Sequence, residues 1–326
     1  MRRRGAEYVP SHHRGGDRVA AAATTCPWCS APRGAGPACE RCGANYAKAE
    51  QIKAQGRAQA VASPPITQPA EVIVTEAPSP VEDPALEFKL CVAAIPVALL
   101  LATLFHFLTP GAQRIVFGMP LHELGHAVSA WFCGFWAIPT LWKTIIPEER
   151  GFIAPILLAG ALGWMMFRAW QAEKRYLVVI GAALLVVQAI GTFYLRESTA
   201  EAVYTFGGDG AGMVLAAALM ATFFFGKRTQ LYKGWLRWGF LFIGAAAFAD
   251  MFATWWVARS DFASIPFGEI EGVGFSDALR LTREHGWTEE ALVRRFVGVG
   301  VASLAGLAAV YAWGVRHAWR KARESS

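Results

Sequence analysis

Residues 114–136, RIVFGMPLHELGHAVSAWFCGFW, place a polar His-Glu-x-x-His pattern inside an apolar segment. Polar groups are costly in such segments and are rarely accidental. On an α-helix His122 and His126 lie one turn apart on the same face, so both imidazoles can reach one metal ion. Glu123 lies about 100° further round the helix. It is therefore placed to take a proton from a water molecule that the metal activates, instead of binding the metal.

The composition predicts an all-α polytopic membrane protein. Of 326 residues, 54% are hydrophobic and 17% charged. After residue 88 the apolar residues form runs of about 20, which is long enough for a helix to cross a bilayer. We expect about six or seven membrane segments and take 88–109 as the insertion signal, because residues 1–70 contain no signal-peptide core. The candidate segments are 88–109, 114–136, 152–170, 176–195, 209–226, 235–258 and 296–315.

Two Cys-x-x-Cys pairs precede the apolar part. Cys26 and Cys29 are separated by nine residues from Cys39 and Cys42. Four thiolates at this spacing can hold one structural zinc ion, and a module so short has too little core to fold without metal. A pair of disulfides, or a redox-active pair, is the alternative. We predict a zinc ribbon with a basic tail over residues 1–46.

Residues 47–84 are rich in Ala, Gln, Pro and Glu and show no sustained apolar stripe, which predicts a flexible or partly extended linker before a membrane domain at 85–326. Up to residue 84 the chain has 10 Lys and Arg against 8 Asp and Glu. This balance argues against nucleic-acid binding. A protein partner is the expected use of the ribbon.

Basic clusters should mark the cytoplasmic face of the membrane. They cannot share one side if every candidate segment crosses. We therefore expect one early segment to enter the membrane and return, with residues 132–151, broken by Gly134, Pro139 and Pro147, lining a cavity. A reduced ribbon suits the cytoplasm, and abundant Ala, Gly and Arg favour a bacterial inner membrane. The clusters are Arg2–Arg4, Lys174–Arg175, Lys227–Arg228 with Lys233 and Arg237, and Arg316–Arg323.

A third protein ligand is expected because catalytic zinc sites generally use three. Asp209 is preferred over Asp250, since its flanking glycines allow close approach of helices and would place it at the start of segment 209–226. There the helix dipole would favour its charge. The competing interpretation of Asp209 is a helix cap.

His122-Glu123-Leu124-Gly125-His126, with Gly208-Asp209-Gly210 in a later segment, resembles the site-2 protease family of intramembrane zinc metalloproteases. The resemblance implies that His122, His126 and Asp209 bind a catalytic zinc and that Glu123 is the base. It also implies membrane-anchored protein substrates. The chain would be a divergent member, because it lacks the family's Asn-Pro element and has two candidate membrane segments between the motifs.

The predicted function is hydrolysis of peptide bonds in the bilayer, with one catalytic and one structural zinc. The alternative is a zinc-binding membrane protein that does not cleave, acting as a sensor, transporter or scaffold whose ribbon recruits a partner. Residues 259–295 form the longest later loop. Ser276-Asp277 is predicted to cap a helix at 278–285 and Thr288 to cap a second. This loop would gate substrate entry or simply pack outside the membrane.

Overall fold

The computed structural model describes residues 24–62, 83–225, 235–270 and 274–324. The chain divides into two compact units, residues 1–77 and 78–326, and each is described by itself. The N-terminal basic tail, most of the predicted linker and the cluster at Lys227, Arg228 and Lys233 lie outside the described residues.

The first unit consists of two cysteine loops followed by helix α1 (Tyr46–Ala62). Tyr46 packs with Cys26, Ala31 and Cys39 in the small core of this unit. The Tyr46 hydroxyl accepts a hydrogen bond from the N–H of Gly34 at 3.1 Å, and the Tyr46 ring lies under the guanidinium of Arg33. Helix α1 covers residues 47–62, which are the first part of the predicted linker. Its alanine, glutamine and lysine residues have high helix propensity, which does not require an apolar stripe.

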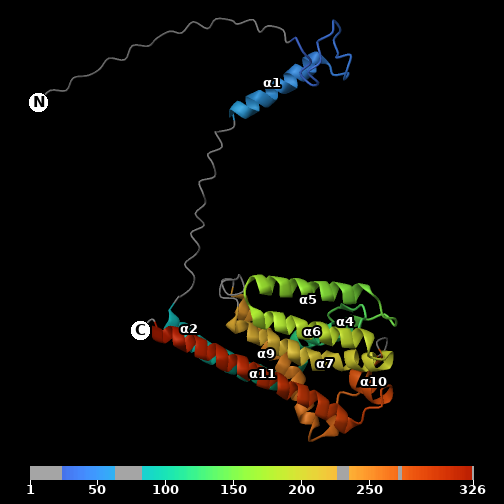
Figure 1. The fold of residues 1–326 in the computed structure, drawn as a ribbon, viewed down its shortest axis with the longest axis vertical. Helices are drawn as coiled ribbons and strands as arrows, with labels where there is room; N and C mark the ends of the chain where they lie inside the picture. Colours follow the sequence, from blue (N-terminus) through green and yellow to red (C-terminus); the bar gives the residue numbers. More distant parts are fainter. Residues whose placement is uncertain (1–23, 63–82, 226–234, 271–273, 325–326) are drawn as a thin grey trace, which may run out of the picture. The chain divides into compact units, whose positions relative to one another are not determined.

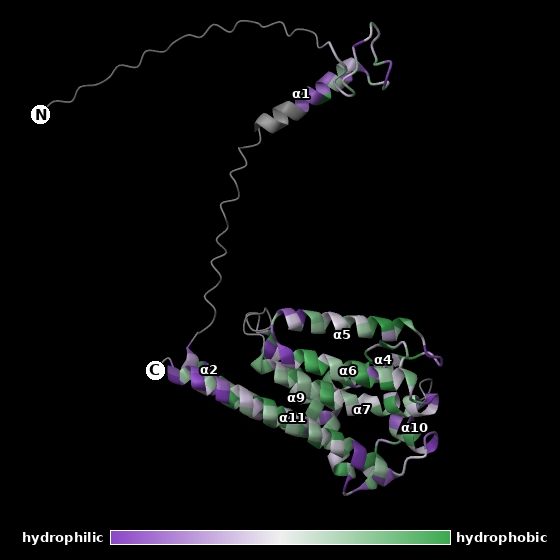
Figure 2. Cartoon of the chain, in the orientation of Figure 1, coloured by the Kyte–Doolittle hydropathy of each residue, from purple (hydrophilic) through white to green (hydrophobic). Residues whose placement is uncertain are grey.

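The second unit is a helical bundle, shown in Figure 1. Six helices in the described part of the chain are long and apolar enough to cross a membrane, which fits a multi-pass integral membrane protein. Figure 2 shows that their middle parts are mostly hydrophobic and that hydrophilic residues gather toward their ends. The main helices are α2 (Pro84–Leu108), α5 (Ile153–Gln171), α6 (Arg175–Phe193), α7 (Glu197–Ala221, continued by the 3-10 turn η2, Thr222–Phe224), α9 (Leu236–Ala258) and α11 (Glu289–Glu324).

The predicted segment 114–136 is not among these six. Within it the structure has the π-helix η1 (Arg114–Gly118) and the helix α4 (Met119–Phe132), directly preceded by the short helix α3 (Pro110–Gln113). At 1.5 Å per residue, the 14 residues of α4 cover only about 21 Å, less than the apolar thickness of a bilayer. The His-Glu-x-x-His pattern therefore lies on a short helix inside the bundle.

Short hairpins occupy two of the connections. Strands β1 (Ile138–Pro139) and β2 (Thr144–Ile145) pair antiparallel between α4 and α5, in the stretch predicted to have irregular backbone. Between α9 and α11, the 3-10 turn η3 (Phe262–Ser264) is followed by β3 (Glu269–Ile270), β4 (Gly274–Phe275) and α10 (Asp277–Arg283). The predicted caps are confirmed, since the side chain of Ser276 accepts from the N–H of Leu279 and that of Thr288 from the N–H of Ala291.

Glycines bring α4 against α7. A Cβ atom on Gly125 would collide with the carbonyl oxygens of Gly207 and Gly208, so the two helix backbones nearly touch. A Cβ on Gly208 would lie 2.7 Å from Nε2 of His126. The glycines around Asp209 thus permit the close approach that the sequence predicts.

Asp209 itself does not begin a helix, which corrects the predicted segment start and the helix-cap interpretation. Helix α7 starts twelve residues earlier, at Glu197, and runs without a break through Asp209. Glycine costs about 1 kcal/mol per residue in a helix interior, but packing against α4 and α9 outweighs this propensity.

Candidate metal centre

Three side chains converge where α4 meets α7 and α10. The Nε2 atoms of His122 and His126 lie 3.1 Å apart. The Oδ2 atom of Asp277 lies 3.1 Å from Nε2 of His122 and 3.0 Å from Nε2 of His126. These three donor atoms form a nearly equilateral triangle. The residues are a group that could hold a metal ion.

The triangle has the size and chemistry of a zinc site. Donors about 2.0 Å from a tetrahedral ion are separated by about 3.3 Å, which is close to the observed spacing. Two imidazoles and a carboxylate are also a usual donor set for catalytic zinc. A triangle of three donors occupies one face of the tetrahedron and leaves the fourth position for water or substrate.

The other nitrogen of each imidazole fixes its orientation. Nδ1 of His126 lies 2.7 Å from the carbonyl oxygen of Tyr204, which can only accept, so this nitrogen must carry the proton. Nδ1 of His122 lies 2.8 Å from Oδ1 of Asp209. Protons at both Nδ1 positions leave the Nε2 lone pairs directed at one another and at the Asp277 carboxylate. A cation between them relieves this repulsion, as in carboxylate–histidine–zinc arrangements.

Asp277 is the first residue of α10, directly after the Ser276 cap. When protons instead of a cation lie on the two Nε2 atoms, burial raises the pKa of this carboxyl group, but the charge of His126 and the hydrogen bonds from both imidazoles outweigh burial and hold the pKa well below its usual range. A metal ion would take the place of those protons, and Asp277 is the anionic partner in either case.

Asp209 lies on the far side of His122 from the donor triangle. Its Oδ1 atom is 2.8 Å from Nδ1 of His122, and its Oδ2 accepts from Nε1 of Trp255 at 2.8 Å. Nη1 of Arg114 lies 3.1 Å from Asp209 and also 3.1 Å from Asp250. The ligand role of Asp209 stays a prediction, whereas the geometry favours Asp277 for the third position.

Asp250 lies further from the imidazoles, in a small buried charge network. Besides Arg114, Asp250 has His106 beside it, with Nδ1 of the imidazole 3.6 Å from Oδ1 of Asp250. These contacts match a buried polar role for Asp250 rather than metal binding.

Glu123 is 4% exposed and is held by the β1–β2 hairpin. The hydroxyl of Thr144 lies 2.7 Å from its Oε2 and 2.8 Å from its main-chain oxygen. Thr144 thus ties β2 to α4 and fixes the position of the Glu123 carboxylate. An oriented carboxylate beside the two histidines is the arrangement that a general base needs.

A cavity of about 630 Å³ contains this centre. The imidazoles are each 9% exposed, so the cavity reaches them but bulk solvent largely does not. Both hairpin connections contribute to its wall, as expected for residues 132–151. Its lining includes Glu123, Trp142, Thr144, Asp209, Asp277 and Arg280.

Asp277 was not predicted as a ligand from the sequence. The capping pattern Ser276-Asp277 places it at a helix start, but nothing in the linear sequence brings α10, about 150 residues away, to the face of α4. The sequence signal that could have indicated Asp277 is an acidic residue at the predicted start of a helix in the loop 259–295.

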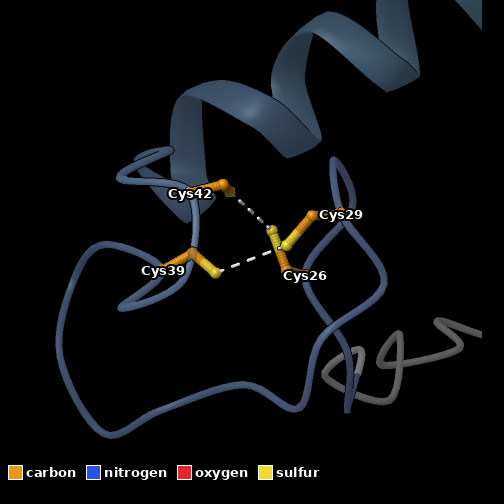
Figure 3. Close-up of side chains that lie close together, drawn as sticks. All are labelled: Cys26, Cys29, Cys39 and Cys42. Atoms are coloured by element: carbon orange, nitrogen blue, oxygen red, sulfur yellow. Dashed lines mark hydrogen bonds between the residues drawn. The ribbon is translucent and has the colours of Figure 1, made fainter.

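The four N-terminal cysteines form a second cluster, shown in Figure 3. The sulfurs of Cys26 and Cys42 lie 3.8 Å apart and those of Cys29 and Cys39 lie 3.6 Å apart. Four sulfurs about 2.3 Å from a tetrahedral ion would be separated by about 3.8 Å, whereas a disulfide bond is about 2.05 Å long. None of the six cysteines forms a disulfide. The cluster is compatible with a zinc ribbon.

The backbone around the cysteines also favours thiolates. In the first loop the N–H of Ser30 donates to the carbonyl of Cys26, and in the second that of Gly43 donates to Cys39. Ser30 and Gly43 both have positive φ angles, so the two loops turn in the same way. The N–H of Cys42 is the main cause that lowers the pKa of Cys39 to about 6. The N–H of Ala44 acts in the same direction on Cys42, but the neighbouring cysteine side chains and burial outweigh it and raise the pKa of Cys42 to about 12.

In comparisons with known proteins, the chain matches no protein-family model, no curated protein and no solved structure. We therefore infer the function from the geometry of the two clusters and from the motifs.

Proposed function

We propose that residues 85–326 form a zinc metallopeptidase that hydrolyses peptide bonds of membrane-anchored proteins. The observation that carries this proposal is the triangle of His122, His126 and Asp277 donor atoms beside the Glu123 carboxylate. The resemblance to site-2 proteases supports the same reaction. The ligand set that we propose differs from the one that the resemblance implies, because we assign the third ligand to Asp277 and give Asp209 a positioning role.

The proposed roles follow from the contacts of each side chain. When bound, zinc would polarise the scissile carbonyl and lower the pKa of a water molecule to about 7. Glu123 would accept a proton from a water molecule through a carboxylate oxygen as the water oxygen bonds to the carbonyl carbon, and the C–N bond would then break. Glu123 then gives the proton to the leaving amine nitrogen. Thr144 holds Glu123 in position, and Asp209 and the Tyr204 carbonyl hold the imidazoles.

The cysteine cluster is proposed to bind a structural zinc ion. Its unit would then be a small folded module for recognition of a protein partner. A reduced thiolate cluster suits the cytoplasm, and the bacterial inner membrane remains the predicted location. A transmembrane substrate would have to unwind locally, because helical carbonyls are shielded by their own hydrogen bonds.

The test is cleavage of a model membrane protein whose single helix carries glycine and proline near its middle, reconstituted with this chain in liposomes. Glu123→Gln removes the base and should slow cleavage by about 10²–10⁴-fold while the zinc content is unchanged. Glu148→Gln, at an exposed residue outside the cavity, is the matched control and should cleave like the wild type. A Glu123→Gln protein as active as the wild type would rule out the proposed reaction and favour the sensor, transporter or scaffold.

A further inference from the structure

The directions of the six long helices are fixed by contacts between their ends. Arg237, at the start of α9, makes two hydrogen bonds of 3.0 and 3.2 Å to Glu87, at the start of α2. The hydroxyl of Tyr311, late in α11, donates to the carbonyl of Val92 at 2.8 Å. Phe223, after α7, packs on Trp238. The start of α2, the start of α9 and the ends of α7 and α11 therefore share one end of the bundle, which we call the α2-start end.

The remaining helices follow by alternation, as can be traced in Figure 1. Helix α7 starts at the opposite end, because it finishes at the α2-start end. Only residues 194–196 separate α6 from α7, so α6 also finishes at the opposite end and starts at the α2-start end. Helix α5, which ends shortly before α6 begins, therefore finishes at the α2-start end. Helix α2 finishes and α5 starts at the opposite end. Residues 109–152, which contain α3, η1, α4 and the first hairpin, therefore enter and leave the bundle at that opposite end. By length and composition the six long helices can each cross a membrane, and this segment then enters and returns without crossing.

The cavity lies toward the opposite end. Its wall includes Trp142 and Lys143, from the connection that precedes α5. It also includes Glu269, Asp277 and Glu284, from the connection between α9 and α11. Both connections belong to the end away from the start of α2. The cavity that contains the histidines is therefore walled in part by both connections of this end.

Charged residues are divided unequally between the two ends. The α2-start end carries more basic than acidic residues, and the short turn between α5 and α6 alone has Lys174 and Arg175. At the opposite end the acidic residues are the more numerous. The described basic residues of the α2-start end are Lys89, Arg168, Lys174, Arg175, Arg237, Arg316, Arg320, Lys321 and Arg323, and its acids are Asp83, Glu87, Glu173 and Glu324.

The opposite end also carries basic residues, in connections short enough to count toward membrane orientation, so the two ends are compared by their numbers of lysines and arginines. Its basic residues are Lys143, Arg150, Arg196, Arg259, Arg280, Arg283, Arg294 and Arg295, and its acids are Glu148, Glu149, Glu197, Glu201, Asp261, Glu269, Asp277, Glu284, Glu289 and Glu290. By sequence the connection between α7 and α9 adds Lys227, Arg228 and Lys233 to the α2-start side.

We propose that the α2-start end faces the cytoplasm and that the metal centre opens to the non-cytoplasmic face of the membrane. Lysine and arginine in short loops are retained on the cytoplasmic side, which orients the six crossings. Any polypeptide that reaches His122, His126 and Asp277 then comes from the non-cytoplasmic side. This consequence for the substrate rests on the proposed function, whereas the orientation does not.

Side-specific labelling of the full chain tests the orientation. Lys143→Cys places a thiol at the exposed rim of the cavity, and Ala172→Cys places one in the exposed turn between α5 and α6. A membrane-impermeant maleimide is added to intact spheroplasts and then to permeabilised ones. Wild type gives the background from native cysteines, of which Cys91 and Cys133 are buried. We expect Lys143→Cys to label in intact spheroplasts and Ala172→Cys only after permeabilisation.

The reverse pattern would overturn the proposal, as would labelling of both variants on the same side. Side-specific labelling reads orientation without requiring activity, so it separates the two proposals. Correct labelling in a protein that cleaves nothing would support the orientation and count against the peptidase. Cleavage together with reversed labelling would support the peptidase and count against the orientation.

Discussion

Two aspartates contact His122 through different nitrogens of its imidazole and therefore have different proposed roles. Asp277 faces both Nε2 atoms, whereas Asp209 holds Nδ1 of His122. Partners of this second kind typically contribute 10–100-fold to metal affinity. Asp209→Asn should therefore weaken zinc binding at this centre by about 10–100-fold without abolishing it. Competition with a chelator of known affinity measures the change.

The conservative change keeps the size of the side chain, and Trp255 can still donate to the amide oxygen. Complete loss of zinc from a folded Asp209→Asn protein would contradict the positioning role and restore Asp209 as a ligand. Asp250→Asn is a matched control, since Asp250 also contacts Arg114 but no donor of the triangle. Its zinc affinity should stay close to that of the wild type.

At the scale of elements, the centre depends on the close approach of α4 and α7. Gly208→Ala would place a methyl group against both imidazole rings and should displace them, with a loss of zinc affinity and of about 1–3 kcal/mol of stability. Gly163→Ala, in α5, meets no atom within 4 Å and should be neutral or slightly stabilising. Thermal unfolding in detergent, with and without zinc, compares the two variants. Equal behaviour would show that the helix contact does not control the centre.

Local sequence patterns predicted several of these elements, because helix caps and apolar helices are determined by residues that are close in sequence. The capping residues Ser276 and Thr288 marked the starts of α10 and α11, and apolar runs marked the long helices. The helix boundary at Asp209 was missed because a glycine-rich run in α7 is held helical by tertiary packing. The third ligand was missed because α10 meets α4 only in the folded chain.

At the scale of the whole molecule, the two clusters belong to separate compact units. Distant sites without shared partners behave additively. Cys39→Ser should therefore remove one zinc ion from the chain and leave cleavage of the model membrane protein unchanged. Metal analysis and the liposome assay test this on the same preparation. Loss of cleavage together with that zinc ion would show that the units are coupled.

The zinc content of the full-length chain decides whether His122, His126 and Asp277 hold a zinc ion. We expect two zinc ions in the wild type and one in both His126→Ala and Asp277→Ala, with the helical content of each variant unchanged by circular dichroism. A folded Asp277→Ala protein that still holds two tightly bound zinc ions would contradict the assignment of the third ligand. One zinc ion in the wild type, lost on Cys39→Ser, would contradict the metal centre itself.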